Sequence, residues 1–533
     1  MAGGAAAVAV GFPYVMKARP HAREHVFLVI ADAMRADVVG KVVNGREVTP
    51  NINALAREGT CFTRAFSASP FTKFSMASIF SGMYPPGHGV EHHLFTLPDC
   101  MTMQRFLSKR GYYCLGLTSN PYMVDEIGPR NSRRPMDFGF NSSFNYYWCA
   151  FGKNNFDPPA PVGLEQLRAY VTGETLNEFL FDALFERKVS VYAPDSPLFV
   201  YLHYMDSHEP WLKTKPIRGI TGEFHAQKSE SVEDCHRQDV DLIYKLLFSD
   251  FPKENAAPAE VERLKAIYLE ASAYADRCIG DMIARLKQRG MYEDSTIIFT
   301  ADHGDELLEH GRIGHCQNLF NTSLEVPLVI KRRGMPRAEV ANRVSNAMLL
   351  PTLAEWFGDE IAHTNLVSLM PYATDAALGN FEVFASFYGK DKVILADGRE
   401  AMNHEDALLY FNAAPAADPA ELRPLAQDAE ALAALKRARF QSERFGKEAG
   451  IVRRFSTRDW QNPFARSQDF AAAQLENSGK ITAEESARLK SLGEFIPEAD
   501  RKRLAGDLAR IKINASALSS GTRDQLRALG YLH

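Results

Sequence analysis

The sequence predicts an α/β protein in which a large, mixed but mostly parallel sheet lies between helices, followed by a small C-terminal antiparallel subdomain and a helical tail. Two apolar runs, residues 25–32 (HVFLVIAD) and 295–302 (STIIFTAD), are typical of buried strands, and each ends in an aspartate. Such strands alternate with segments of helical periodicity, which favours a parallel sheet covered on both faces. Beyond Gly379, residues 381–388 and 392–396 indicate an antiparallel hairpin instead.

The alternation of strands and helices runs through most of the chain. Pro50 and Asn51 begin a helix with apolar spacing, and residues 101–110 are an amphipathic helix that ends at Gly111. After Asn412 the composition turns to Ala, Asp, Glu and Arg with helical spacing, which predicts the helical tail. The other expected elements are strands at residues 61–66, 112–118, 196–205 and 328–331 and helices at residues 164–185 and 261–289.

The composition is that of a globular enzyme rather than a nucleic-acid-binding protein. Of the 533 residues, 46% are hydrophobic and 24% are charged. The 61 basic and 66 acidic residues provide no global field that would recruit nucleic acid, so an anionic substrate must be attracted locally. The length suits one large α/β domain with a smaller one appended, and it is compatible with a homo-oligomer.

Cysteine usage and the N-terminal segment bear on the cellular compartment. The seven cysteines are odd in number and lack CxxC spacing, which argues against a disulfide framework or a zinc–cysteine site and favours a reduced compartment. Residues 4–15 (GAAAVAVGFPYV) are apolar, but they lack a basic flank and are too short to span a bilayer. They are either the remnant of a secretory signal or a loose terminus. The compartment is therefore undetermined, with the cytoplasm favoured over the periplasm.

Asp32, Asp302 and His303 place two hard oxygen ligands and an imidazole at the ends of two expected strands. This set fits Mn²⁺, Zn²⁺ or Mg²⁺ better than Ca²⁺, which prefers oxygen ligands alone, and one ion is favoured over two. Alternatively, each aspartate caps the helix that follows its strand. Two strand-ending acids beside a histidine favour the metal site.

A hydroxyl-rich turn, residues 69–75 (SPFTKFS), contains the expected nucleophile. A hydroxyl bound to a divalent ion has a lowered pKa and is nucleophilic at neutral pH. Thr72 is the first choice, because it begins a helix whose amides can receive an anion, and Ser75 is the second. Thr72 could instead be only an N-cap. Lys73 is expected either to stabilise a transferred oxyanion or to be a solvated lysine.

Two loop histidines extend the set. His208 lies in a turn after the strand at residues 196–205, and His315 follows the polar segment 305–314. Either could protonate a leaving group or bind its non-bridging oxygens. A loop histidine alone is more often structural, so both belong to the site only as members of this set. The expected catalytic residues are Thr72, Lys73, His208 and His315, and the expected metal ligands are Asp32, Thr72, Asp302 and His303.

Taken together, these residues resemble the sulfatase family of the alkaline phosphatase superfamily. The resemblance implies a metal at Asp32, Asp302 and His303, with the nucleophile at Thr72. Matching segments follow the family's order over nearly the whole chain and are specific only in combination. They are residues 29–37 (VIADAMRAD), 49–51 (TPN), 69–89, 206–210 (DSHEP), 300–305 (TADHGD), 309–311 (EHG), 326–328 (VPL) and 526–532 (LRALGYL).

The chain departs from the family pattern at the nucleophile and beside the metal. Thr72 stands where sulfatases have the cysteine that becomes formylglycine, a conversion that threonine cannot undergo. Phe74 and Met76 replace the usual Pro and Arg of that motif. Ala33 replaces the second acid of a paired aspartate, which removes one oxygen ligand.

The threonine favours phosphoryl transfer over the hydrolysis of sulfate esters. A formylglycine hydrate expels sulfate by collapsing to an aldehyde, whereas a sulfated threonine needs water to attack sulfur. We therefore expect a threonine-nucleophile variant of the family that hydrolyses phosphate mono- or diesters or phosphonate monoesters through phosphothreonine. Its substrate would be an anionic ester of a small molecule, lipid or glycan, with Asn120 and Tyr122 as binding residues by the same resemblance. The alternatives are a sulfuric ester hydrolase, a phosphotransferase and a catalytically degenerate binding protein.

The resemblance and the composition together predict four regions. They are an N-terminal tail at residues 1–23, a sulfatase-like catalytic domain at 24–370, a small C-terminal β subdomain at 371–412 and a helical C-terminal extension at 413–533.

Overall fold

The computed structural model describes most of residues 24–455, and the expected N-terminal tail and residues 456–533 lie outside the described part. Within the described part, every helix is too short or too polar to span a bilayer. The structure describes all seven cysteines, and none of them is in a disulfide bond. The gaps in the description are residues 92–94, 121–122, 124–139, 141, 150–171, 185–195, 212–215, 227–230, 248–255, 317, 363, 365, 376, 389, 405–406, 413–428 and 449–453.

An eight-stranded mixed sheet forms the centre of the molecule, in the order β13-β4-β12-β9-β1-β8-β6-β7. β12 is antiparallel to both of its neighbours, and every other adjacent pair is parallel. The prediction of a mixed, mostly parallel sheet is therefore confirmed. The strands are β1 His25–Ala31, β4 Thr60–Phe66, β6 Tyr113–Thr118, β7 Tyr146–Cys149, β8 Leu198–Tyr204, β9 Ser295–Thr300, β12 Glu325–Lys331 and β13 Ala338–Ser345.

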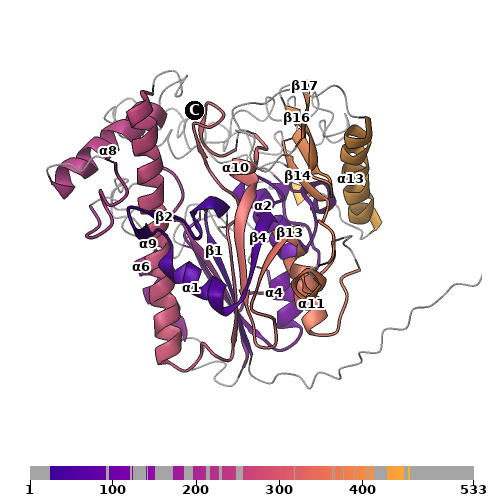
Figure 1. Cartoon of the computed structure of the whole chain (residues 1–533). Coiled ribbons are helices and arrows are strands. Elements are labelled where there is room, and N and C mark those ends of the chain that lie inside the picture. The colour runs from indigo at the N-terminus through magenta and orange to yellow at the C-terminus, as the bar shows by residue number, and fades with distance from the viewer. Residues whose placement is uncertain are drawn as a thin grey trace, which may run out of the picture.

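Helices cover both faces of this sheet (Figure 1). On one side lie α1 Pro50–Glu58, α6 Gly173–Asp182 and the long α9 Pro258–Gln288, and on the other lie α2 Thr72–Ser81, α4 Met103–Ser108 and α11 Leu349–Trp356. The first turn of α1 is satisfied by α9, because Asp276 accepts from the backbone amides of Asn51 (3.2 Å) and Ile52 (2.7 Å). Pro50 needs no such partner, since it lacks an amide proton at the first helical position.

A second sheet of four antiparallel strands confirms the expected C-terminal β structure, and the predicted hairpin is its first pair, β14–β15. Its strands are β14 Val383–Phe387, β15 Lys390–Ile394, β16 Arg399–His404 and β17 Ala407–Asn412. Helix α13 (Ala429–Glu448) packs beside this sheet, where Arg439 pairs with Asp391 (2.9 Å) and with Glu91 (2.9 Å) (Figure 1). The division of the chain at residues 370 and 412 stays a prediction.

Shorter elements complete the described structure. Residues 216–247 lie between β8 and α9 and include α8 (Val232–Leu247), a helix that the sequence analysis did not anticipate. β18 is extended although it lies in the region expected to be helical, and it pairs with β5. The remaining elements are β2 Val42–Val43, β3 Arg46–Glu47, β5 Phe95–Thr96, β10 Glu306–Leu307, β11 Ile313–Gly314, β18 Arg454–Phe455, α3 Pro85–His88, α10 Asn321–Leu324, α12 Met370–Thr374 and 3₁₀ turns at Ala36–Val38 and Asn346–Met348.

The four central strands β9, β1, β8 and β6 are adjacent and parallel, so their carboxyl ends meet at one edge of the sheet. The residues that follow these strands are Asp302, Asp32, Asp206 and Asn120. Helix α2 begins beside the same edge with Thr72. The fold thus gathers segments that are far apart in the sequence into one site.

Candidate active site

Asp32 is held in place directly after β1. Its backbone amide donates to the carbonyl of Tyr204 (2.8 Å), and its side chain is fully buried. The Oδ2 atom accepts hydrogen bonds from Asn120 Nδ2 (2.6 Å) and His203 Nε2 (2.9 Å). In contrast, Oδ1 has no hydrogen-bond donor among the residues that the structure describes.

Asp302 has the same asymmetry. Its Oδ1 atom accepts from the backbone amides of Ala33 (3.2 Å) and His303 (3.0 Å), whereas its buried Oδ2 atom lacks a donor in the described part of the chain. Ala33 can direct its amide to Asp302 because it adopts the left-handed conformation, with φ of 58°. The position that carries the second acid in the resembling family is thus a backbone donor in this chain.

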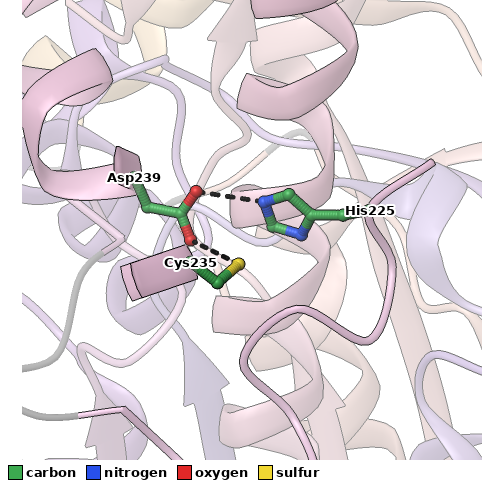
Figure 2. Close-up of side chains that lie close together, drawn as sticks. All are labelled: His225, Cys235 and Asp239. Atoms are coloured by element: carbon green, nitrogen blue, oxygen red, sulfur yellow. Dashed lines mark hydrogen bonds and ion pairs between the residues drawn. The ribbon is translucent and has the colours of Figure 1, made fainter. Parts of the chain in front are cut away.

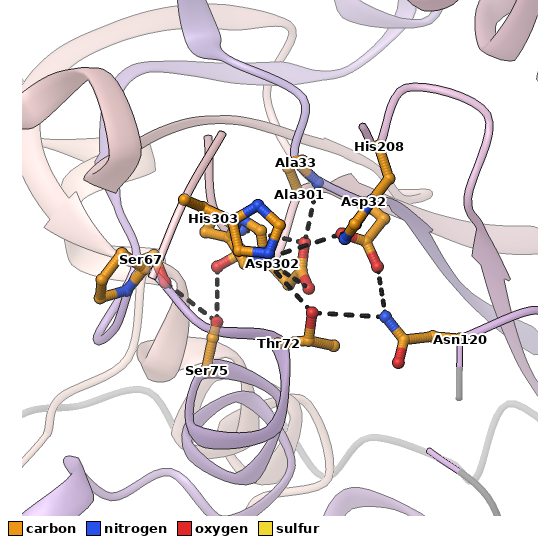
Figure 3. A network of polar contacts seen from close by, with 12 residues as sticks. Asp32, Ala33, Ser67, Thr72, Ser75, Asn120, His208, Ala301, Asp302 and His303 are labelled. Atoms are coloured by element: carbon orange, nitrogen blue, oxygen red, sulfur yellow. Dashed lines mark hydrogen bonds and ion pairs between the residues drawn. The ribbon is translucent and has the colours of Figure 1, made fainter. Parts of the chain in front are cut away.

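His303 points its Nε2 atom toward both of these free carboxylate oxygens (Figure 3). The distances are 3.7 Å to Asp32 Oδ1 and 3.6 Å to Asp302 Oδ2. The other ring nitrogen, Nδ1, lies 3.1 Å from the carbonyl of Gly304. Because a carbonyl can only accept, Nδ1 carries a proton, and Nε2 faces the two acids.

These three side chains fit a divalent metal ion. Asp32, Asp302 and His303 are fully buried, and their ligand atoms lie within 4.8 Å of one another. A buried carboxylate oxygen without a partner is costly, and a cation between the two free oxygens would supply that partner. The alternative in which both aspartates only cap helices does not explain why one oxygen of each is left without a donor.

Thr72 begins α2 and directs its hydroxyl into this cluster (Figure 3). The hydroxyl lies 3.2 Å from His303 Nε2 and accepts from Asn120 Nδ2 at 3.3 Å. The N-cap position of α2 is occupied by Phe71, so the alternative in which Thr72 is only an N-cap fails.

Ser75 has a structural position instead. Its hydroxyl donates to the backbone carbonyl of Asp302 (2.6 Å) and accepts from the hydroxyl of Ser67 (2.9 Å). The first bond holds the segment that carries Asp302 against α2, and the second ties Ser67, which follows β4, to the same helix (Figure 3). Ser75 therefore positions a metal-ligand candidate, and Thr72 remains the better candidate for the nucleophile.

Lys73 is fully buried, which excludes the alternative of a solvated lysine. It follows Thr72 in the first turn of α2. Its expected role in stabilising a transferred oxyanion stays a prediction.

Asn120 lies within the site, whereas Tyr122 is outside the described residues. The two protons on Asn120 Nδ2 go to Asp32 Oδ2 and Thr72 Oγ1. This amide therefore links a metal-ligand candidate to the candidate nucleophile. Its expected role in substrate binding stays a prediction.

His208 and His315 lie over the same cluster. The ring centroid of His315 is 4.2 Å from that of His303 and 4.7 Å from that of His208. His208 Nδ1 donates to the carbonyl of Glu209 (2.7 Å), which leaves Nε2 3.9 Å from Asp32 Oδ1. His315 Nδ1 is held by Asp305 Oδ1 at 2.8 Å. Each ring thus has one anchored nitrogen and one nitrogen available for proton transfer.

The local charges act on these groups in different directions. Burial alone would raise the pKa of Asp32, but the imidazoles of His208, His203 and His303 lower it far below its usual range. Burial lowers the pKa of His208, yet the carboxylate of Asp32 outweighs burial and raises it to about 9. Burial and the neighbouring His303 lower the pKa of His315 to about 4.

A second set, His303, Asp305 and His315, also groups potential metal ligands, and it shares His303 with the first. In this set His315 bonds directly to Asp305, and the other oxygen of Asp305 accepts from Trp211 Nε1 (2.9 Å). Both oxygens of Asp305 are therefore satisfied within the protein. The first set is the better site for an ion.

His203 is the residue that the sequence analysis missed. It lies within β8, where it is fully buried, and its Nε2 proton bonds to Asp32 Oδ2. Its Nδ1 atom accepts from the hydroxyl of Tyr201 at 2.6 Å. Burial raises the pKa of Tyr201 well above its ordinary value, so this phenol remains a donor. Tyr201 and His203 are two residues apart on one strand, so their side chains share one face of the sheet. This spacing is the signal in the sequence that could have pointed to His203.

Replacing His203 with phenylalanine should weaken metal binding by about 10- to 100-fold, because Asp32 would lose a donor that orients it. His203→Gln keeps a side-chain donor and should retain much of the affinity. Titration of the chelator-treated variants with Mn²⁺ or Zn²⁺ measures this difference. Equal affinity in the wild type and in His203→Phe would show that His203 is only a core residue.

Comparison with known proteins agrees with this architecture. A solved protein of the alkaline phosphatase superfamily from Vibrio parahaemolyticus has a similar fold. It superimposes with a TM-score of 0.54 and 16% identity, covering 80% of this chain and 88% of that one. Residues 24–359 match the family model described as Sulfatase. The chain belongs to the sulfatase family and is a hydrolase of ester bonds. Enzymes of this family generally depend on a divalent metal.

Individual relatives are distant. The multifunctional alkaline phosphatase superfamily protein PehA of Trinickia caryophylli is 25% identical over 404 residues, which cover 66% of this chain and 77% of the relative. Choline-sulfatase of Rhizobium meliloti is 24% identical over 343 residues, with coverage of 60% and 66%. The solved phosphonate monoester hydrolase SpPMH of Silicibacter pomeroyi superimposes with a TM-score of 0.58 and 19% identity, covering 80% of this chain and 96% of that one.

Proposed function

We propose that this protein hydrolyses phosphate diesters and phosphonate monoesters through a covalent intermediate on Thr72. One observation carries the proposal: the Thr72 hydroxyl contacts His303 at 3.2 Å beside two buried carboxylate oxygens that lack donors. A divalent ion held by Asp32, Asp302 and His303 together with Thr72 would lower the pKa of the hydroxyl and neutralise substrate charge.

The residues of the chain prepare the hydroxyl for attack. Asn120 holds Thr72 Oγ1 through one amide proton and Asp32 through the other, so nucleophile and ligand keep a fixed separation. In the first step the Thr72 hydroxyl gives its proton to solvent water, its oxygen forms a bond to phosphorus, and the bond from phosphorus to the ester oxygen breaks.

The leaving oxygen needs a proton, and two imidazoles lie nearby. His208 and His315 each have one ring nitrogen anchored to the protein and a second nitrogen that can carry a proton. Lys73 contributes positive charge next to Thr72. In the second step water attacks phosphorus, the bond to Thr72 breaks, and the threonine oxygen regains a proton.

A threonine at the position of the nucleophile supports phosphorus esters, rather than sulfate esters, as substrates. Threonine lacks the second hydroxyl through which a formylglycine hydrate releases sulfate. The covalent ester on threonine must therefore be cleaved by attack of water at the phosphorus or sulfur atom. PehA and SpPMH are named as an alkaline phosphatase superfamily protein and a phosphonate monoester hydrolase, which is consistent with this preference. Choline-sulfatase is named for the competing activity.

A side-by-side kinetic comparison tests the substrate class. With metal-reconstituted protein, an aryl phosphodiester and an aryl phosphonate monoester should be cleaved with kcat/KM at least about tenfold above that of the matching aryl sulfate, a difference of about 1.4 kcal/mol in transition-state binding. The three substrates share a leaving group, so the comparison isolates the central atom. A higher kcat/KM for the sulfate would assign the protein to sulfuric ester hydrolysis.

A further inference from the structure

A second cluster of metal-ligand side chains lies away from the active site, between α8 and α9 (Figure 2). His225, Cys235 and Asp239 are 4%, 2% and 2% exposed, and their ligand atoms lie within 4.8 Å of one another. Cys235 and Asp239 are four residues apart on α8, so they share one face of the helix. His225 reaches them from the preceding loop.

We propose that His225, Cys235 and Asp239 bind a Zn²⁺ ion that fastens the loop carrying His225 to α8. The proposal does not depend on the function of the active site. A thiolate, an imidazole and a carboxylate are the ligand types that Zn²⁺ takes, and three protein ligands leave one tetrahedral position for water. The odd number and wide spacing of the cysteines concealed this site, because only one of them takes part.

The distances suit tetrahedral coordination. Zinc–ligand bonds of 2.0–2.3 Å place neighbouring ligand atoms roughly 3.3–3.6 Å apart. Here His225 Nε2 lies 3.0 Å from Asp239 Oδ1, and Cys235 Sγ lies 3.7 Å from Asp239 Oδ2. These two contacts bracket the tetrahedral separation (Figure 2). A bound ion would take the place of the protons in these two hydrogen bonds, and only small side-chain movements would be needed.

The surroundings orient the ligands. Glu270 on α9 contacts the other ring nitrogen of His225 at 3.0 Å, the arrangement in which a carboxylate fixes a metal-bound imidazole. The same Glu270 oxygen accepts from the amide of Gly222 at 2.6 Å. Gly222 has φ of +80°, and a Cβ there would lie 3.4 Å from Cys235 Sγ. The loop that carries His225 is thus folded closely over the thiol.

Arg263 on α9 is a further charged group against the cluster. It donates to Asp239 Oδ1 (2.6 Å) and approaches Cys235 Sγ at 3.6 Å. With the imidazole doubly protonated, the charges of His225 and Arg263 balance those of Asp239 and Glu270. With Zn²⁺ bound, a neutral imidazole and a thiolate restore the same balance. The exchange of two protons for one divalent ion therefore buries no net charge.

Titration with Co²⁺ tests the site in the full-length Asp302→Asn variant, in which the active-site set has lost a ligand. After chelator treatment, added Co²⁺ should produce a thiolate-to-cobalt charge-transfer band. Cys235→Ser in this background should abolish the band. Cys114→Ser should keep it, because within the described part of the chain the hydrogen bonds of that buried thiol go to the backbone carbonyls of Gln104 and Tyr112.

Zinc should raise the Tm of the Asp302→Asn protein, and the rise should disappear with Cys235→Ser. His225→Gln provides a second variant, with affinity expected to fall at least about tenfold. Absence of both the band and the rise in Tm would leave the cluster as an ion-pair network and overturn the proposal. A band that survives Cys235→Ser would overturn it as well.

Discussion

Replacing Thr72 with alanine is expected to lower kcat by about 10³-fold or more while the fold and most of the metal binding persist. The substitution removes the attacking oxygen and its contact with His303, but Asp32, Asp302 and His303 keep their other contacts. Steady-state kinetics with an aryl phosphodiester, alongside metal analysis of the same preparation, measures both expectations.

Two matched variants separate loss of the nucleophile from loss of structure. Thr72→Ser keeps a hydroxyl at the start of α2 and should retain measurable turnover. Ser75→Ala removes the bond to the Asp302 carbonyl, so it should lower stability and metal affinity rather than remove the covalent step. Turnover at the wild-type rate in Thr72→Ala would rule out the threonine mechanism and make Ser75 the nucleophile to test.

Asp302→Asn should lower activity by more than about 10- to 100-fold. A loss of that size is typical when a residue that hydrogen-bonds to a metal ligand is changed, whereas Asp302 is itself a candidate ligand. Asparagine keeps the acceptor for the amides of Ala33 and His303, yet it replaces the free Oδ2 with a neutral amide group. Metal content and kcat/KM should therefore fall together, with only partial recovery in excess Mn²⁺ or Zn²⁺.

Asp276→Asn is the control for this variant. Asp276 is a buried carboxylate that caps the first turn of α1, so its loss should lower the free energy of unfolding without changing metal affinity at the active site. If Asp302→Asn binds metal as tightly as the wild type, or if the chelator-treated wild type keeps full activity, the assignment of the metal site is wrong.

Much of the fold follows from local patterns. Continuous apolar runs with β-branched residues predicted β1 and β9 to within two residues, because strands buried on both faces require such sequences. The two additional strands β16 and β17 were not predicted, since residues 399–412 mix charged and apolar residues without clear alternation.

The sequence also indicated which residues gather in the candidate site. Aspartates at strand ends had to meet at the carboxyl edge once the strands were parallel, and Asp32 and Asp302 do so. His203 could not be identified in this way, because a histidine inside an apolar strand looks like a core residue until its neighbour across the sheet is known. The link that Asn120 makes between Asp32 and Thr72 likewise depends on tertiary structure alone.

The covalent step itself can be observed directly. Metal-reconstituted protein should be mixed with an aryl phosphodiester, quenched in acid within the first turnovers and digested for mass spectrometry. Our account predicts that the peptide containing Thr72 carries the phosphoryl ester on that threonine, and that the adduct is absent from Thr72→Ala. A protein that turns over the substrate while Thr72 remains unmodified, or an adduct on another residue, would contradict it.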